Sequence, residues 1–420
     1  MEPKKINLPL AGSECCGGNN AASDSGCCDV PVSPNGDTIS TKEQAVRERY
    51  SAASQERKDE LCCPISYPTE LLEAIPQEVI EKDYGCGDPT PFVRPGDTVL
   101  DLGSGAGKLC FISAQLTGPQ GQVIGVDCNS DMLEVARRNN EIFAETVGFE
   151  NVEFRCGMIQ DLQLDLELLT ERLSDVDRAS VDGLLEQRRI EQTLRDQFRM
   201  IPDNSVDCVI SNCVLNLVRP EDRVQLFSEI YRVLRDGGRA AISDIVSDED
   251  VPESMQNDGE LWSGCISGAW RDDRFVDEFQ KIGFYGIEIA NWSEEPWQVI
   301  NGIEFRSMTV VAHKGKEGSC LEANQAVIYA GPFSQVVDDD GSTYRRGQRT
   351  AVCNKTFQLL SRKPYADAFI RLEPKEAVPL ESAQEFDCNV DQVREASVTK
   401  GGNQVVRQES SGGACGPGCC

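Results

Sequence analysis

Cysteine is the residue type in this sequence with the most chemistry to offer. The 420 residues include 19 Cys but only one His. Cys213 has the most informative position, because it follows the apolar run Val206–Ile210 and the pair Ser211–Asn212, which we interpret as a buried strand and a turn. The carboxyl end of such a strand borders the ligand in open α/β sheets. The sequence therefore places a thiol, a ligand for soft metal centres, where a substrate is expected.

The composition limits the class of protein. An odd number of scattered cysteines does not fit a secreted disulfide framework. No apolar run approaches the ~20 residues needed to cross a bilayer, and the polar start MEPKKINLPLAGSE is not a signal peptide, so we expect a cytoplasmic protein with no membrane partner. The net charge of -29 argues against nucleic acid, since phosphate binding requires an excess of Lys and Arg. The single His313 follows a strand-like run and is interpreted as structural.

The thiols must be positioned by alternating strands and helices that begin at Asp97. Short apolar runs typical of buried parallel strands occupy residues 98–103, 122–127, 152–157, 206–210 and 239–246. Helical patterns lie between them at residues 108–116, 130–147 and 220–238, the last with acids at its start and a Gly pair at its end. This alternation predicts a doubly wound α/β sheet with helices on both faces.

A glycine-rich segment, VLDLGSGAGK at residues 99–108, lies between the first strand and the first helix. Gly103, Gly105 and Gly107 allow the backbone to turn tightly and to approach a ligand closely. The spacing is G-x-G-x-G, so Lys108 stands where a dinucleotide fingerprint needs its third Gly, and the Lys-Ser/Thr ending of a P-loop is missing.

Two carboxylates at strand ends indicate the cofactor instead. Asp101 would repel a pyrophosphate but could accept hydrogen bonds from an amino group. Asp127 ends the second strand, where an acid can bind both ribose hydroxyls. Together they predict S-adenosylmethionine as the methyl-donating co-substrate, and a tight turn that binds nothing is the alternative. The other residues expected to contact the cofactor are Tyr84, Ser104, Ile159 against the adenine, and Asn212.

Four segments in a fixed order resemble the arsenite S-adenosylmethionine methyltransferases. They are YGCG at 84–87, DLGSGAGK at 101–108, SNCVLNLV at 211–218 and ELWSGCISGA at 260–269. The resemblance spans about residues 45–315 and implies a Rossmann-like class I methyltransferase sheet. It also implies that Cys86, Cys213 and Cys265 bind trivalent arsenic, the substrate. A further amino-terminal cysteine of the family corresponds to Cys62 or Cys63, and both alternatives stay open.

The chemistry of arsenic supports this mapping. Trivalent arsenic is thiophilic, and three sulfurs leave it pyramidal with an exposed lone pair that can attack a methyl group without a general base. We expect helix ends or cations to lower the pKa of the ligand thiols. Methyl transfer oxidises the arsenic, so we expect Cys62 or Cys63 to form a transient disulfide with Cys86. A thiol reductant, glutathione or thioredoxin, would then reduce that disulfide.

The other cysteines receive weaker interpretations. Buried Cys is often only a small hydrophobic residue, which is our interpretation of Cys110, Cys128, Cys156 and Cys208. Cys320, Cys353 and Cys388 lie outside the resemblance and receive no role. The pairs Cys15–Cys16, Cys27–Cys28 and Cys419–Cys420 lie in Gly-rich tails and could either capture arsenite or belong to simple spacers.

Composition also predicts the domain organisation. We expect a disordered Cys-containing tail (1–40), an N-terminal segment with a helix at 41–61 and thiol loops (41–96), and an S-adenosylmethionine-binding domain (97–246) with a charged helical insertion (162–200). An arsenic-binding region (247–315), a small β-rich domain of unknown role (316–378) and a disordered tail ending in a Cys pair (379–420) follow.

The predicted function is therefore methylation of thiolate-bound As(III) by a protein interpreted as a monomer, with small-molecule arsenicals and a thiol reductant system as its partners. Two alternatives remain at the level of sequence. One is a class I methyltransferase that acts on another thiophilic metalloid or small molecule. The other is a thiol-rich scavenger of soft metals.

Overall fold

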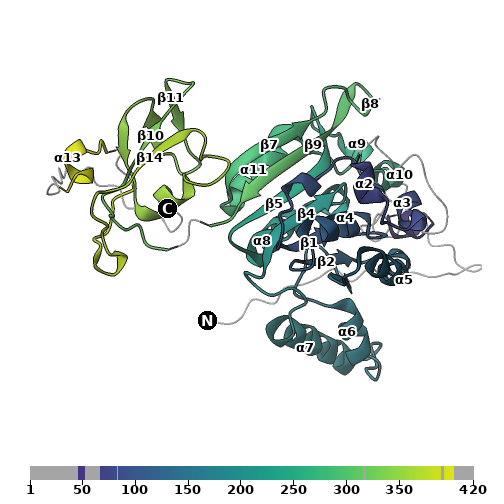
Figure 1. Ribbon diagram of the computed structural model, residues 1–420. Helices are drawn as coiled ribbons and strands as arrows, with labels where there is room; N and C mark the ends of the chain where they lie inside the picture. The colour runs from purple at the N-terminus through teal and green to yellow at the C-terminus, as the bar shows by residue number, and fades with distance from the viewer. Residues whose placement is uncertain (1–45, 53–66, 83, 316–317, 389–391, 402–420) are drawn as a thin grey trace, which may run out of the picture. The chain divides into compact units, whose positions relative to one another are not determined.

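The computed structural model describes residues 46–52, 67–82, 84–315, 318–388 and 392–401 (Figure 1). Three groups of predicted features lie outside these ranges. They are the tail at 1–40, the candidate redox cysteines Cys62 and Cys63, and the terminal Cys pairs. In the described part of the chain, no helix is long and apolar enough to cross a membrane.

One nine-stranded sheet forms the centre of the fold within the described residues, with the strand order β3-β2-β1-β4-β5-β9-β7 along its main path. Strands β1 to β5 pair in parallel, whereas β9 is antiparallel to both β5 and β7. The bounds along this path are β3 Val152–Cys156, β2 Gln122–Asp127, β1 Thr98–Leu102, β4 Val206–Asn212, β5 Leu234–Ser247, β9 Ile303–His313 and β7 Tyr285–Trp292. Two short strands pair off this path, β6 (Trp270–Arg271) with β5 and β8 (Gln298–Ile300) with β9.

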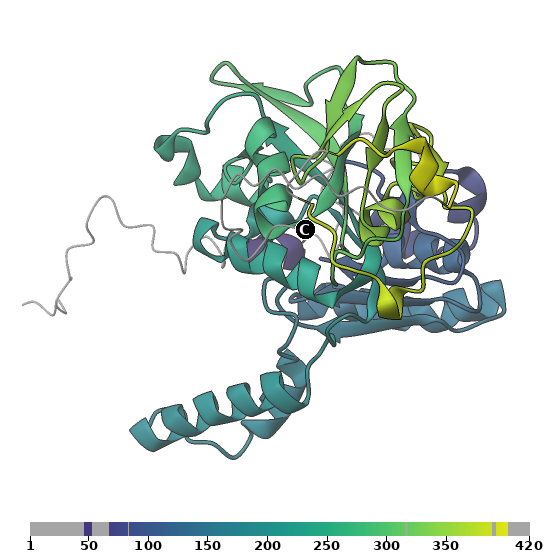
Figure 2. The ribbon, with the colours of Figure 1, turned by 90° about the vertical axis from the view of Figure 1, so that its left-hand side faces the viewer.

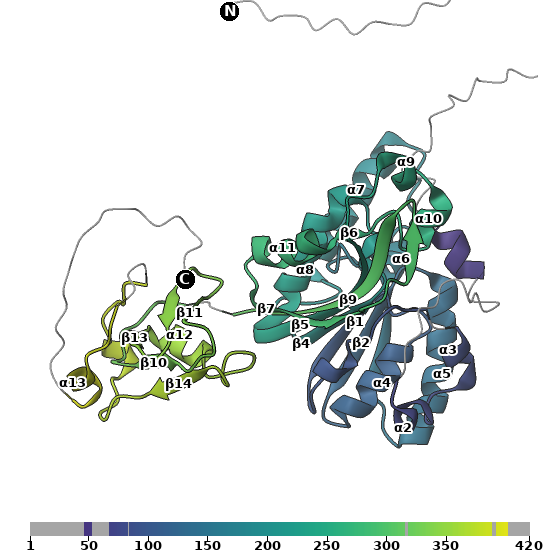
Figure 3. The ribbon, with the colours of Figure 1, turned by 90° about the horizontal axis from the view of Figure 1, so that it is seen from above.

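Helices cover both faces of this sheet, as predicted (Figure 3). Alternate residues of a strand point to opposite faces, so Val99 and Leu100 of β1 belong to different apolar clusters. The cluster around Val99 includes side chains of α4 (Lys108–Thr117) and α5 (Ser130–Val147). The cluster around Leu100 includes side chains of α8 (Arg223–Val233) and α11 (Asp272–Ile282). The doubly wound α/β prediction is therefore confirmed.

Two predicted element ends were wrong. Strand β4 continues through Ser211 and Asn212, which pair with Ile242 and Ser243 of β5, so the predicted turn is strand. Helix α8 ends at Val233 rather than at the Gly pair, because Leu234 already pairs with Val206 in the sheet. In both places sheet hydrogen bonds across the chain override a local preference for a turn or a helix end. The one-turn helices η3 (Leu215–Leu217) and η4 (Pro220–Asp222) connect β4 to α8.

The segment before β1 contains short helices. Residues 46–52 are helical, within the helix predicted at 41–61. Two short helices follow, α2 (Thr69–Leu72) and α3 (Gln77–Glu81), which are separate because Pro76 cannot continue a helix and instead precedes α3. The one-turn helix η2 (Thr90–Phe92) leads into β1, and α9 (Glu253–Gln256) and α10 (Gly259–Ser263) follow β5.

The charged insertion predicted at 162–200 contains two helices, α6 (Leu166–Arg172) and α7 (Val181–Gln197). They form the teal pair at the lower left of Figure 2. A small apolar cluster of Leu164, Leu169, Leu173 and Leu194 holds them together. An ion pair of 2.9 Å between Arg195 and Asp161 fastens α7 to the base of the insertion.

The residues after β9 form a small β-rich domain, as predicted. Its three-stranded sheet has the order β13 (Arg349–Ala351), β10 (Ala326–Tyr329), β14 (Phe369–Leu372), and a hairpin joins β11 (Gln335–Val337) to β12 (Thr343–Arg345). The short helices are α12 (Asn354–Leu359), η5 (Leu380–Ser382) and α13 (Ala396–Thr399).

The prediction of a disordered tail from residue 379 was wrong for residues 379–388 and 392–401. Val393 forms a β-bridge with Thr350, and the buried Arg394 side chain pairs with Glu322 at 2.8 Å. The polar composition concealed this part of the domain, because its order depends on paired polar groups more than on apolar periodicity.

An aromatic cluster between α8 and α11 provides a test of the packing on this face of the sheet. Phe279 is fully buried, and its ring centroid lies 4.9 Å from that of Phe227. We expect Phe279→Ala to lower the free energy of unfolding by about 3–5 kcal/mol, since it leaves a cavity that the rigid sheet cannot fill. Val224→Ala on the exposed side of α8 is the control and should change the free energy of unfolding by less than about 0.5 kcal/mol. Urea unfolding measures both variants. Equal effects of the two substitutions would contradict this packing.

Candidate active site

A cavity of about 810 Å³ lies at the carboxyl ends of the central parallel strands. Its position agrees with the rule that open α/β sheets bind ligands beyond these strand ends. All but one of the residues predicted to contact a cofactor line it, namely Tyr84, Asp101, Gly103, Ser104, Gly105, Asp127, Ile159 and Asn212. Cys213 lines the same cavity.

The glycine loop makes the wall next to β1. Gly103 and Gly105 have φ values of 72° and 51°, in the left-handed region that other residues rarely adopt. A side chain at Gly103 would also meet Val214 at 2.5 Å. Gly107 is the exception among the predicted cofactor residues, because it does not line the cavity. It precedes α4 with φ 91°, and a Cβ there would lie 2.7 Å from Phe154, so its role is to let helix and sheet pack.

The two predicted carboxylates face this cavity. Asp127 accepts hydrogen bonds from the backbone N–H groups of Gly105 (2.9 Å) and Asn129 (2.8 Å), and burial raises its pKa. Asp101 is buried and accepts a hydrogen bond from the Cys110 thiol at 3.2 Å. That contact is in keeping with the structural interpretation of Cys110.

The cavity also contains a polar atom that lacks a partner. Ser104 Oγ is buried and has no hydrogen-bond partner in the described part of the chain. An unsatisfied buried hydroxyl costs about 1–3 kcal/mol, which a polar ligand in the cavity would offset. The two carboxylates and this hydroxyl fit a ligand with an amino group and ribose hydroxyls, and therefore fit S-adenosylmethionine.

Three of the predicted thiols converge beside the cavity. The sulfurs of Cys86 and Cys213 and a carboxylate oxygen of Asp244 all lie within 4.8 Å of one another. The Cys265 thiol donates a hydrogen bond to the carbonyl oxygen of Cys213 at 3.1 Å. Cys86 and Cys265 are each 4% exposed, so the cluster is nearly closed to solvent.

Asn212 holds the first of these thiols in place. Its Oδ1 accepts hydrogen bonds from the backbone N–H groups of Cys86 (2.9 Å) and Gly87 (3.0 Å), and its Nδ2 donates to the Gly87 carbonyl at 2.7 Å. A side chain at Gly85 would lie 2.3 Å from Asn212 Nδ2, which explains the glycine before Cys86. The predicted cofactor role of Asn212 is therefore at most partial, because its amide group is committed to the YGCG loop.

Asn216 holds the second thiol in a similar way. Its Nδ2 donates to the carbonyl oxygens of Ile245 (2.7 Å) and Cys265 (3.2 Å), and its backbone N–H donates to Asp244 at 3.3 Å. Cys213 thus lies between two asparagines that each fix another cysteine. Asn212, at the end of β4, holds Cys86, and Asn216 holds Cys265.

The backbone of two of these cysteines is strained. Cys213 and Cys265 both have φ 63°, a left-handed conformation that is uncommon outside glycine. Such residues cost roughly 1–3 kcal/mol each and persist only where their surroundings hold them. Here the Cys213 N–H donates to Ser243 at 2.8 Å and Asn216 holds the Cys265 carbonyl. Because the backbone is strained at both cysteines, the direction of the two thiols matters more here than local backbone stability.

The predicted lowering of the thiol pKa was wrong. A hydrogen bond with Cys265 lowers the pKa of Cys213, but a hydrogen bond with Cys86 and burial outweigh it and raise that pKa well above its usual value. A hydrogen bond with Cys213 and burial raise the pKa of Cys265 in the same direction. The charge of Asp244 adds to both effects, and burial raises its own pKa to about 7. Burial and mutual hydrogen bonds therefore favour the protonated form of the Cys213 and Cys265 thiols.

Sequence reasoning missed three residues of this site, namely Asn216, which holds Cys265, and also Asp244 and Tyr50. Asp244 was concealed inside the apolar run AAISDIV, although a carboxylate in a buried strand is itself a signal of a polar site. Tyr50 lies on the helical residues 46–52, lines the cavity and is hydrogen bonded to Cys265, while burial raises its pKa. Its only signal was an aromatic side chain in a charged, amphipathic helix.

This helix is joined to both halves of the site. Asn129 Nδ2, at the start of α5, donates to Ser51 Oγ at 3.2 Å. Arg49 donates to Ser263 Oγ of α10 at 3.0 Å. Residues 46–52 therefore connect the wall of the glycine-loop cavity to the segment that carries Cys265.

Comparison with known proteins identifies the family. Residues 94–291 match a family described as a methyltransferase domain, and residues 316–404 match a domain of unknown function. The chain is 31% identical over 336 residues to the arsenite methyltransferase of Aquipseudomonas alcaligenes, which covers 75% of this chain and 86% of that protein. It is 28% identical to the arsenite methyltransferase of Homo sapiens, with 83% and 87% covered. It is 34% identical to that of Halobacterium salinarum, of which it spans 58%.

A solved structure agrees with this assignment. The arsenic (III) S-adenosylmethionine methyltransferase from Chlamydomonas reinhardtii is 27% identical, with a TM-score of 0.51, and the match covers 77% of this chain and 100% of that one. The glycine loop, Cys213 and Cys265 lie within residues 94–291, which match the methyltransferase-domain family. The chain therefore belongs to the arsenite methyltransferase family of S-adenosylmethionine-dependent class I methyltransferases.

Proposed function

We propose that this arsenite methyltransferase binds its As(III) substrate on Cys86, Cys213 and Cys265, next to the glycine-loop cavity. The observation that carries the proposal is the convergence of these cysteines, which come from three distant segments of the chain. The thiol-rich scavenger and the methyltransferase for another substrate, both left open by the sequence, are disfavoured by family membership together with an intact cofactor cavity.

The cavity walls would hold the cofactor at three places. Asp127 would accept from the ribose hydroxyls, Asp101 from the amino group, and Ile159 would pack against the adenine. S-adenosylmethionine, when bound, would supply the methyl group whose carbon the arsenic lone pair attacks. The chain's own contribution is position, since the asparagines fix the thiols in line with the cavity.

Loading of arsenite suits protonated thiols. When As(OH)₃ meets three thiols, three As–S bonds form, three As–O bonds break, and each thiol proton leaves with a hydroxide as water. No net proton is taken up or released, so the raised pKa values of Cys213 and Cys265 are no obstacle. The water-poor surroundings also favour the neutral, three-coordinate product over separate charges.

The thiol ligands can be tested by substitution. We expect Cys213→Ser and Cys265→Ser each to abolish methylation of every trivalent arsenical, because a hydroxyl is a hard and poor ligand for As(III). Cys86→Ser should impair inorganic arsenite more than an already methylated substrate, which has only two valences left for protein sulfur. Product analysis with a labelled methyl donor measures both effects and also tests the function itself.

Cys156→Ser is the matched control, since this thiol lies at the end of β3 and outside the cluster. It should retain full activity. Unimpaired methylation by Cys213→Ser would refute the proposed ligand set.

Asn212 separates positioning from cofactor binding. We expect Asn212→Ala to weaken arsenite binding roughly 10–100-fold, the usual effect of losing a residue that orients a ligand, and to change S-adenosylmethionine affinity less. Asn212→Asp keeps the acceptor for the N–H groups of Cys86 and Gly87, so it should recover part of the loss. Calorimetric titration of each ligand makes the comparison. A larger loss of cofactor affinity than of arsenite affinity would assign Asn212 to the cofactor instead.

The reductive step involves cysteines outside the described residues. Methyl transfer oxidises arsenic from the trivalent to the pentavalent state, and two thiols can return the two electrons by forming one disulfide. We propose that Cys62 or Cys63 pairs with Cys86 in this way, and that a dithiol or glutathione then reduces the bond. Mass spectrometry of enzyme quenched after one turnover without reductant should detect it. Finding all three as free thiols would exclude this route.

A further inference from the structure

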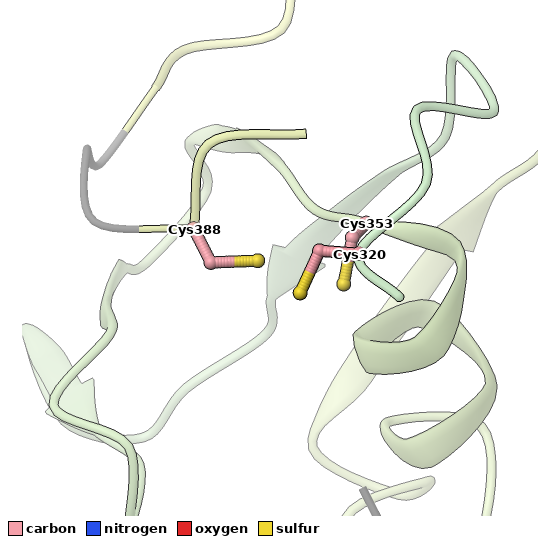
Figure 4. A group of neighbouring side chains, drawn as sticks. All are labelled: Cys320, Cys353 and Cys388. Carbon is pink, nitrogen blue, oxygen red and sulfur yellow. The ribbon is translucent and has the colours of Figure 1, made fainter. Parts of the chain in front are cut away.

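A second group of three cysteines occurs in the C-terminal domain. The sulfurs of Cys320, Cys353 and Cys388 all lie within 4.8 Å of one another (Figure 4). Cys320 lies between β9 and β10, Cys353 directly precedes α12, and Cys388 follows η5, so three separate segments supply the thiols. Nothing in the sequence connects these cysteines, because Cys353 lies 33 positions after Cys320 and Cys388 lies 35 positions after Cys353.

Backbone hydrogen bonds hold these segments together. The Phe386 N–H donates to the Cys320 carbonyl at 2.8 Å, and the Asn354 N–H donates to the Leu321 carbonyl at 2.8 Å. Leu321 also forms a β-bridge with Glu385. Each thiol is therefore carried by a segment that is bonded to its neighbour independently of any bound ion, so the site is preformed.

The composition of the group selects its ligand. In the described part of the chain, the group contains three thiols and no His, Asp or Glu. Structural zinc sites usually have four protein ligands, and hard cations require oxygens. Trivalent arsenic is soft and forms three bonds, so three sulfurs complete its coordination. Cys353 is buried, while Cys320 and Cys388 are partly exposed, which leaves the site a path for exchange with solvent.

The state of the thiols is compatible with capture. A hydrogen bond with Cys388 has the largest effect on the pKa of Cys353, and hydrogen bonds with Thr356 act in the same direction. Together they lower this pKa to about 5 despite partial burial. A thiolate is a better nucleophile towards arsenic than a thiol. The core cluster lacks this feature, because its thiols have raised pKa values.

We propose that Cys320, Cys353 and Cys388 form a second As(III) site, one that holds the substrate rather than methylating it. None of the residues lining the cofactor cavity comes from the described residues 318–401, so arsenic at this site has no methyl donor beside it. Loading forms three As–S bonds and breaks three As–O bonds of As(OH)₃. The three thiol protons leave with the three hydroxides as water, so bonds and protons balance without an acid or a base.

Peptide-resolved alkylation of the intact, reduced protein tests this without any substitution. Arsenite should protect Cys320, Cys353 and Cys388 together, with one common midpoint, while the alkylation of Cys156 stays unchanged. Protection of one or two of the three, or none, would overturn the proposal. So would a disulfide between two of them in the reduced protein.

Binding stoichiometry provides the second test. The Cys320→Ser/Cys353→Ser/Cys388→Ser variant should bind one arsenic per chain fewer than the natural protein, whereas Cys156→Ser should lose none. If the triple variant fails to fold, Cys388→Ser alone replaces it, since this variant keeps the buried Cys353. It should lose tight arsenite binding at this site. Equal stoichiometry in all variants that fold would overturn the site. The methylation rate of the triple variant at saturating arsenite should be unchanged, so this result is independent of the core thiols.

Zinc is the competing occupant, and a metal measurement distinguishes it. Protein purified without added metal should contain less than a stoichiometric amount of zinc. X-ray absorption spectroscopy at the arsenic edge of an arsenite-loaded Cys86→Ser/Cys213→Ser/Cys265→Ser variant should report three sulfur neighbours around arsenic. One zinc per chain that arsenite does not displace, and that the C-terminal triple variant lacks, would show that the group is a structural zinc site.

Discussion

The whole site depends on the carboxamide of Asn212. This one side chain joins the last residue of β4 to the YGCG loop through three hydrogen bonds, and residues 84–87 of that loop belong to no helix or strand. Because the amide both donates and accepts, it fixes the direction of the loop as well as its distance. Gly85 follows from this contact, since a side chain there would collide with Asn212, whereas a side chain at Gly87 would collide with Ser243 of β5.

Electrostatics explains why the core cluster can be so deeply buried. Three thiolates beside a carboxylate would place like charges in a low-dielectric interior, which is prohibitively costly without cations. Protonated thiols avoid this cost, and the raised pKa values of Cys213, Cys265 and Asp244 are its direct expression. In the proposed loading step a neutral arsenite releases neutral water, so binding adds no net charge to this buried site.

The sequence allowed the sheet and the cofactor loop to be predicted, because their signals are local, whereas the three core thiols were identified through the resemblance of their segments to a known family. Apolar runs identify strands, and Gly103 and Gly105 occupy positions where only glycine is comfortable. Contacts between distant segments could not be predicted. Nothing near Asn212 indicates that its amide binds residues 86 and 87, and the sequence led us to assign it to the cofactor instead.

The error about the charge of the thiols has a three-dimensional origin. A pKa depends on what surrounds a thiol in three dimensions, so the expected lowering at the core cluster was wrong, whereas Cys353, which had received no role, has a lowered pKa. The same limitation concealed the order of residues 392–401, where the buried Arg394 is satisfied by Glu322 from another part of the domain.

The contrast between the two thiol groups suggests a division of labour within the chain. In the core group, Cys213 and Cys265 have a strained backbone, and Cys86 and Cys265 are buried, which suits precise orientation of arsenic towards a methyl donor. The C-terminal group is partly exposed, with a lowered pKa at one thiol, which suits rapid capture. Exchange of As(III) between thiols proceeds by stepwise substitution at arsenic, and a captured atom can pass to other thiols without being reduced or oxidised. A thiophilic substrate that binds almost any exposed cysteine favours a protein that captures it at one place and orients it at another, because one site cannot be both open enough to load quickly and closed enough to aim the lone pair.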